Sequence, residues 1–246
     1  MAYNKHFLPL ESNPALFSQL IHELGVSPAL SFHDVWSLDD PDLLSFIPRP
    51  VLAFIIVFPT TSDYEERLAT EKASTEIRSS EPGRGDAIWF KQTINNACGL
   101  YGILHAVANG QARDFIAPGS HLADLLERCD SLNTADIAKT LEADKDLESK
   151  YNMVATQGDT EPPENAEDEV DFHYVCFVKS HLNDNLFILD GDRDGPIDKG
   201  SFTGQDLFSN QGIEAIQDFI RHHDSDGENG GQFSLLALAP SSETAD

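Results

Sequence analysis

VLAFIIVF, residues 51–58, is the stretch that decides the fold of this chain. Every residue in it is apolar, so the segment offers no side that could face water. A strand of this composition lies inside a sheet that is covered on both faces. The segment is therefore predicted to be the central strand of a mixed α/β (α+β) fold, with helices packed above and below it.

The rest of the chain supplies elements to surround this strand. Its 246 residues and 40% hydrophobic content are enough to bury a full core, and they fit one domain, residues 1–246, better than two. Helical spacing and cap residues predict a short helix after Leu38 and helices over 14–24, 62–78, 122–128, 134–147 and 213–222. Apolar runs between turn residues predict strands over 87–91, 172–178, 185–190 and 233–239.

The charge balance indicates which kinds of binding partner the chain attracts and which it repels. Sixteen basic residues against forty-two acidic ones leave a net charge of −26. Such a chain repels phosphate backbones and anionic lipid and attracts cationic protein surfaces. Neither nucleic acid nor a membrane is therefore an expected partner.

Cysteine usage and the first residues bear on the compartment. Cys98, Cys129 and Cys176 are sparse, odd in number and without metal-ligand spacing, so neither a disulfide scaffold nor a bound metal is expected. The opening residues contain no apolar signal-peptide core, and no apolar run approaches the roughly 20 residues of a membrane span. We expect a soluble cytoplasmic protein that is not secreted, with the nucleus as a second location.

The stretch KQTINNACGLYGILHA, residues 91–106, combines a thiol with an amide. Helical spacing of the apolar residues places Cys98 in the first turn of a helix, with Asn95 and Asn96 as candidate N-caps. A helix N-terminus stabilises an anion, which favours a reactive thiolate. Gln92, six residues upstream, is a candidate oxyanion donor. Taken alone, however, such a cysteine is more often a packed small hydrophobe.

His173 and Asp190 are candidates for the base and the group that orients it. If the strands around them form a hairpin that turns between His181 and Leu182, the two residues lie opposite each other on one face. Opposed side chains of an antiparallel pair are close enough for an imidazole to meet a carboxylate. The loop chemistry does not force this register, and either residue alone has an ordinary structural explanation.

Several separated motifs, in order, resemble the short, single-domain ubiquitin carboxyl-terminal hydrolases, which are papain-like cysteine peptidases. They are FLPLESNP, PRPVLAFIIVFP, KQTINNACG, VDFHYVCFV, FILDG and FSLLALAPS, and they run almost from end to end. The resemblance implies a knotted papain-like topology with a mostly antiparallel sheet of about six strands. It implies a catalytic set of Cys98 as nucleophile, His173 as general base and acid, Asp190 as its orienting carboxylate, and Gln92 with the Cys98 backbone N–H as the oxyanion hole.

The same resemblance implies hydrolysis of the bond after the C-terminal glycine of ubiquitin or a ubiquitin-like modifier, with small or disordered leaving groups and no cofactor. A crossover loop over about residues 151–171 would straddle the site, and its acidic, proline-containing sequence fits a flexible gate as well as mere solubilising charge. Glu11 and Asp34 match acidic positions near the ubiquitin surface. The acidic chain suits a cationic ubiquitin tail. We expect a monomeric, free enzyme.

Other readings stay open at this point. DGDRDG, residues 190–195, copies the first half of an EF-hand loop, but Ser201 stands where that loop needs a glutamate, so a solvated turn is the better interpretation. The chain could also be a catalytically silent ubiquitin-binding module of the same fold. A third possibility is another papain-like enzyme, such as an acyltransferase.

Overall fold

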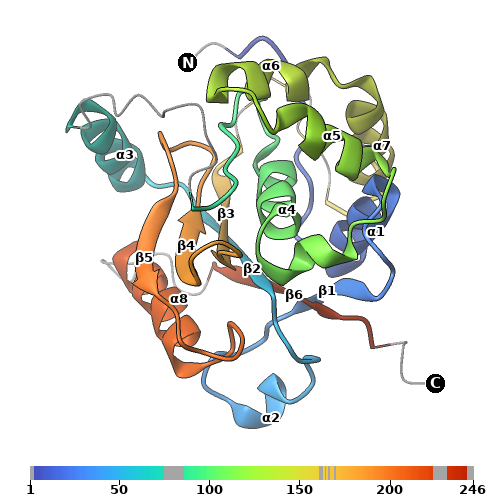
Figure 1. Cartoon of the computed structure of the whole chain (residues 1–246). Helices are drawn as coiled ribbons and strands as arrows, with labels where there is room; N and C mark the ends of the chain where they lie inside the picture. Colours follow the sequence, from blue (N-terminus) through green and yellow to red (C-terminus); the bar gives the residue numbers. More distant parts are fainter. Residues whose placement is uncertain are drawn as a thin grey trace.

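A six-stranded sheet organises the computed structural model of the protein, in the order β1-β6-β2-β3-β4-β5 (Figure 1). The structure describes residues 3–74, 86–160, 163, 165, 167–168, 170–223 and 232–242. Every pairing between the six strands is antiparallel. The strands are β1 (Leu30–Asp34), β2 (Ala53–Pro59), β3 (Phe172–Lys179), β4 (Asn185–Leu189), β5 (Ile197–Ser201) and β6 (Ser234–Pro240).

The predicted central strand is confirmed as β2, which pairs with β6 on one side and β3 on the other. Its alternate side chains enter two separate cores. Ala53, Ile55 and Val57 belong to one core, and Phe54, Ile56 and Phe58 to the other. The side-chain period of two explains why the whole run is apolar, since both sides of the strand are covered.

Helices cover both faces of the sheet (Figure 1). One core receives residues of α1, α4, α5, α6 and α7, and the other those of α2, α3 and α8. The helices are α1 (Pro14–Leu24), α2 (Pro41–Leu44), α3 (Ser62–Ser74), α4 (Cys98–Ala108), the 3-10 helix η1 (Gly110–Phe115), α5 (His121–Cys129), α6 (Thr134–Ala143), α7 (Lys145–Ala155) and α8 (Asn210–His223). No helix in the described part of the chain is both long and apolar enough to cross a membrane.

Several predicted boundaries were wrong. The helix expected over 134–147 is two helices, because the Asp144 carboxylate accepts the Leu147 N–H at 3.0 Å and caps the start of α7. Helix α7 continues to Ala155, so the expected crossover loop begins as helix at Tyr151. Strands β1 and β5 were not predicted. The last residues of the helix expected over 62–78, and residues 161, 162, 164, 166 and 169 of the crossover loop, lie outside the described residues.

The hairpin of β3 and β4 forms with a different register from the predicted one. Cys176 pairs with Leu189 and Phe177 with Ile188, which shifts β4 by two residues and takes His173 out of direct opposition to Asp190. A shift of two keeps every side chain on its predicted face. Val175, Phe177, Leu186 and Ile188 accordingly share one core, on the face that also carries His173.

Candidate active site

Cys98 is the first residue of α4, as its helical spacing predicts. The expectation that Asn95 or Asn96 caps this helix was wrong. Ala97 occupies the cap position, and its side chain makes no capping hydrogen bond. Asn96 instead adopts a left-handed conformation, φ 56°, and its Nδ2 donates to the Asp168 carbonyl at 2.9 Å. An N-terminus without a side-chain cap keeps its donors and its positive dipole end directed at an anion beside Cys98.

The segment before Gln92 was predicted as a strand over 87–91, but its backbone bonds to the side chains of His105 in α4 and of Asn109 directly after α4, and not to a neighbouring strand. The amide of Asn109 accepts the Ile88 N–H and donates to the Ile88 carbonyl, both at 2.8 Å. His105 Nε2 accepts the Phe90 N–H at 3.0 Å, and the two rings stack at 5.7 Å. Burial lowers the pKa of His105 to about 4, so the ring stays neutral and can accept this bond. The helix that carries Cys98 therefore also fixes the segment that carries Gln92.

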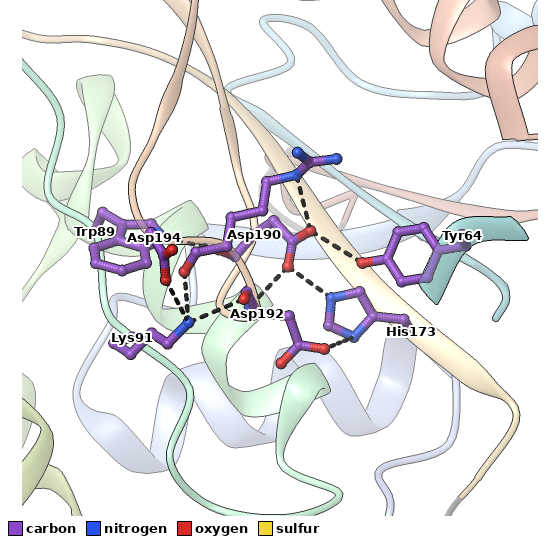
Figure 2. Close-up of polar contacts among 8 residues, drawn as sticks. Tyr64, Trp89, Lys91, His173, Asp190, Asp192 and Asp194 are labelled. Atoms are coloured by element: carbon purple, nitrogen blue, oxygen red, sulfur yellow. Dashed lines mark hydrogen bonds and ion pairs between the residues drawn. The ribbon is translucent and has the colours of Figure 1, made fainter. Parts of the chain in front are cut away.

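The loop after β4 is fastened to the same segment (Figure 2). Trp89 Nε1 donates to the Asp190 carbonyl at 2.8 Å, and the Gln92 N–H donates to the Gly191 carbonyl at 2.9 Å. Lys91 Nζ donates to the carbonyls of Asp192 and Arg193, at 2.9 and 2.7 Å. These bonds hold the candidate oxyanion donor and the candidate orienting carboxylate as one unit.

His173 and Asp190 meet although they are not opposed in the ladder. The imidazole Nε2 lies 2.7 Å from Asp190 Oδ1, and both side chains are at most 5% exposed. Asp190 lies one residue beyond β4, where the chain leaves the ladder and turns back toward His173. The Asp192 N–H donates to the same carboxylate oxygen at 2.9 Å.

The second carboxylate oxygen of Asp190 has two further partners. Tyr64 of α3 donates its phenol O–H to Oδ2 at 3.2 Å (Figure 2). Arg193 Nε lies 3.3 Å from the same oxygen. Four groups thus hold the carboxylate, counting His173 and the Asp192 N–H. A buried carboxylate bound in this way has few ways to rotate, so it fixes the imidazole that it contacts.

His173 and Asp190 each shift the pKa of the other toward its charged form. Burial alone would lower the pKa of His173, but the charges of Asp190 and Asp192 and the hydrogen bonds with Asp190 and Cys98 raise it well above its ordinary value. Burial would likewise raise the pKa of Asp190, yet the charge and hydrogen bond of His173 hold it below the usual range. The imidazolium form is therefore favoured beside the Cys98 thiol.

A cleft of about 300 Å³ opens beside Cys98. Its lining includes Glu11, Asn96, Thr160 and Tyr174. Glu11 does not point free into this cleft, because its Oε2 accepts the Thr160 N–H at 2.7 Å. Asp34 is the last residue of β1, paired with Leu236, and is not part of the cleft lining.

The structure thus brings four of the six predicted site residues together and leaves two outside this group. Cys98, His173, Asp190 and Gln92 come together from α4, β3, the loop after β4 and the extended segment. Glu11 lies at the cleft and Asp34 apart from it. Among the described residues, no group of three or more histidine, cysteine or acidic side chains is arranged to hold a metal ion.

Comparisons with known proteins show which family the chain belongs to. Residues 7–221 match the family described as ubiquitin carboxyl-terminal hydrolase, family 1. The chain belongs to this family. The ubiquitin carboxyl-terminal hydrolase of Aplysia californica is 34% identical over 89% of this chain and 97% of its own. Ubiquitin carboxyl-terminal hydrolase YUH1 of Saccharomyces cerevisiae is 33% identical over 98% of both chains.

The fold of the family is seen in solved structures. The catalytic domain of Trichinella spiralis UCH37, crystallised with ubiquitin vinyl methyl ester, superposes with a TM-score of 0.72 at 22% identity and covers 97% of each chain. The mixed α/β fold of this hydrolase-family chain, with its six-stranded antiparallel sheet, therefore confirms the predicted fold class.

Sequence reasoning about this family member missed the groups that support the site. They are Tyr64, Trp89, Lys91, His105, Asn109, Asp192 and Arg193. The DGDRDG run was noticed only for its likeness to a calcium loop. Its density of charge directly after a candidate orienting aspartate was the available signal for Asp192 and Arg193. The partners on α3 and α4 had no comparable signal, because only the fold brings them near.

Proposed function

We propose that this protein is a thiol hydrolase that cleaves the amide, ester or isopeptide bond after the C-terminal glycine of ubiquitin. One observation carries the proposal: a buried carboxylate lies 2.7 Å from the imidazole of His173, whose pKa is raised in part by the thiol of Cys98 at a helix N-terminus. This arrangement has the parts of an activated thiol nucleophile. Membership of the family supplies the substrate class.

The proposed chemistry begins with attack of the Cys98 thiolate on the carbonyl carbon. The carbonyl oxygen becomes an oxyanion, which the side-chain amide of Gln92 and the Cys98 backbone N–H stabilise. His173 as imidazolium then gives its proton to the departing amine, and a thioester on Cys98 remains. A water molecule attacks this thioester while His173 takes its proton, and collapse releases the carboxylate and the thiolate. Asp190 keeps the ring in the tautomer and rotation that both transfers need.

We further propose that small or disordered leaving groups are preferred. Two described contacts draw the crossover segment toward the site: Glu11 bonds residue 160 on one side, and Asn96, two residues before Cys98, bonds residue 168 on the other. A segment tethered at both ends limits what can pass beside the thiol. The bond from Thr160 to Glu11 supports a role for Glu11 in holding this segment, in addition to its predicted contact with ubiquitin. The contact of Asp34 with ubiquitin, action on a ubiquitin-like modifier, the monomeric state and the cytoplasmic location stay predictions.

A fluorogenic C-terminal amide of ubiquitin tests the activity. Wild-type protein is expected to turn it over, and Cys98→Ala to lose at least about 10⁴-fold in kcat while still binding ubiquitin. Cys129→Ala is the matched control, because Cys129 is a buried thiol of α5 and lies outside the site. Wild-type protein that binds ubiquitin but never cleaves it would show instead that the chain is a catalytically silent binding module.

A further inference from the structure

A second carboxylate flanks the imidazole of His173 (Figure 2). Asp192 Oδ2 lies 3.8 Å from Nδ1, while Asp190 Oδ1 lies 2.7 Å from Nε2. Because Asp190 takes Nε2, Nδ1 is the nitrogen that remains for proton exchange with Cys98 in the proposed mechanism. Asp192 therefore sits on the reactive side of the ring, and its side chain is 27% exposed, so water only partly screens its charge.

The position of Asp192 is fixed by its backbone. Its N–H donates to Asp190 Oδ1 at 2.9 Å, and its carbonyl accepts from Lys91 Nζ at 2.9 Å. The next carbonyl, of Arg193, accepts from the same ammonium group at 2.7 Å. A residue held from both sides in this way presents its carboxylate at a defined distance from the ring.

The other charged and titratable groups around His173 do not replace this carboxylate. Arg193 is engaged with Asp190, and Tyr64 donates to Asp190 as a neutral phenol whose pKa is raised, first by burial and then by the charge of Asp190. His105, on α4, is neutral near pH 7, since burial lowers its pKa to about 4. His223 of α8 contacts Tyr64, and the centroids of the two rings are 5.7 Å apart.

We propose that Asp192 is a positioning residue that stabilises protonated His173 from the Nδ1 side and so preserves the imidazolium beside the Cys98 thiolate. The inference rests on the proposed function for its catalytic meaning. Its physical content, a second carboxylate acting on the imidazolium, does not depend on the substrate. Asp192 touches neither the leaving group nor the oxyanion in this account, and it acts only through His173.

The test is a titration of His173 by NMR in wild-type protein and in Asp192→Asn, with the signal assigned among nine histidines from its loss in His173→Gln. Asparagine keeps the shape and the backbone bonds but removes the charge. Removing a charge 3.8 Å away, partly open to solvent, is expected to lower the His173 pKa by about one unit. The basic limb of kcat/KM for the ubiquitin amide is expected to move down by the same amount.

Asp194→Asn is the matched control. Asp194 lies on the same loop and is 51% exposed, and its carboxylate faces Lys91 at 3.4 Å and not His173. This variant is expected to leave the His173 titration within about 0.2 units of wild type. An unchanged His173 pKa in Asp192→Asn, or equal shifts in both variants, would overturn the inference even if ubiquitin is hydrolysed. A shift confined to Asp192→Asn in a protein that does not hydrolyse ubiquitin would uphold it and reject the proposed function.

Discussion

Gly191→Ala is predicted to lower turnover by displacing Gln92. Gly191 follows the orienting Asp190, and a methyl group on it would lie 2.8 Å from Gln92 Cβ and 3.3 Å from the Gln92 backbone nitrogen. Its φ lies outside the left-handed region, so alanine brings a steric conflict and no backbone strain. The side chain of Gln92 is buried, and its Cβ has no freedom to turn away.

The size of the displacement follows from these distances. Ordinary contact begins at 3.4 Å, so the two segments must separate by about 0.6 Å. The 2.9 Å bond from the Gln92 N–H to the Gly191 carbonyl would lengthen toward about 3.5 Å, which is no longer a good hydrogen bond. A misplacement near 1 Å can lower a rate by about 10²-fold, and complete loss of an oxyanion donor by about 10²–10³-fold. We expect kcat to fall by about 10- to 100-fold.

The assay compares kcat and KM for the ubiquitin amide in wild type, Gly191→Ala, Gln92→Ala and Gly195→Ala. Gly195 lies on the same loop, and a methyl group there would meet no atom within 4 Å, so that variant is the control. A donor that acts on the transition state affects kcat and leaves KM nearly unchanged. Overpacking also lowers stability by about 1–3 kcal/mol, and thermal melting checks that each variant is folded at the assay temperature.

Two results would refute this reasoning. If Gly191→Ala stays folded and keeps its full kcat, then Gln92 either is not displaced or is not a donor to the oxyanion. If Gln92→Ala itself keeps full kcat, the second explanation holds.

Two further predictions concern other parts of the molecule. The unfolded chain protonates His105 near pH 6.5 and the folded protein only near pH 4, so the stability contributed by the neutral ring is complete above pH 6.5 and is lost as the pH falls toward 4. Urea unfolding should therefore show that the stability advantage of wild type over His105→Gln shrinks by about 2 kcal/mol between pH 7 and pH 5, and a constant difference would contradict a buried neutral His105. A glycine-serine insertion after Thr160 is expected to raise cleavage of a folded ubiquitin fusion relative to the small amide, because the tethered segment becomes longer; an unchanged ratio of the two rates would exclude gating by this segment.

Much of the fold was predictable because its signals are local. The apolar run 51–58 predicted a strand with two covered faces, and β2 has them. The helix predicted over 14–24 is confirmed as α1, which lies between the cap residues Asn13 and Gly25. The strand predicted over 87–91 failed because its backbone bonds go to the side chains of His105 and Asn109, and a propensity pattern cannot distinguish that from a ladder.

The sequence by itself determined which chemical groups are available and which face of each element they occupy. Periodicity placed Cys98 in the first turn of its helix and kept His173 on the correct side of β3, because side-chain periods are set by local backbone geometry. Only the tertiary structure decided the pairing of β3 with β4, the bend that returns Asp190 to His173, and the approach of Tyr64, Lys91 and Asp192. Those arrangements depend on contacts between residues far apart in the chain, where many registers satisfy the same local pattern and packing selects one.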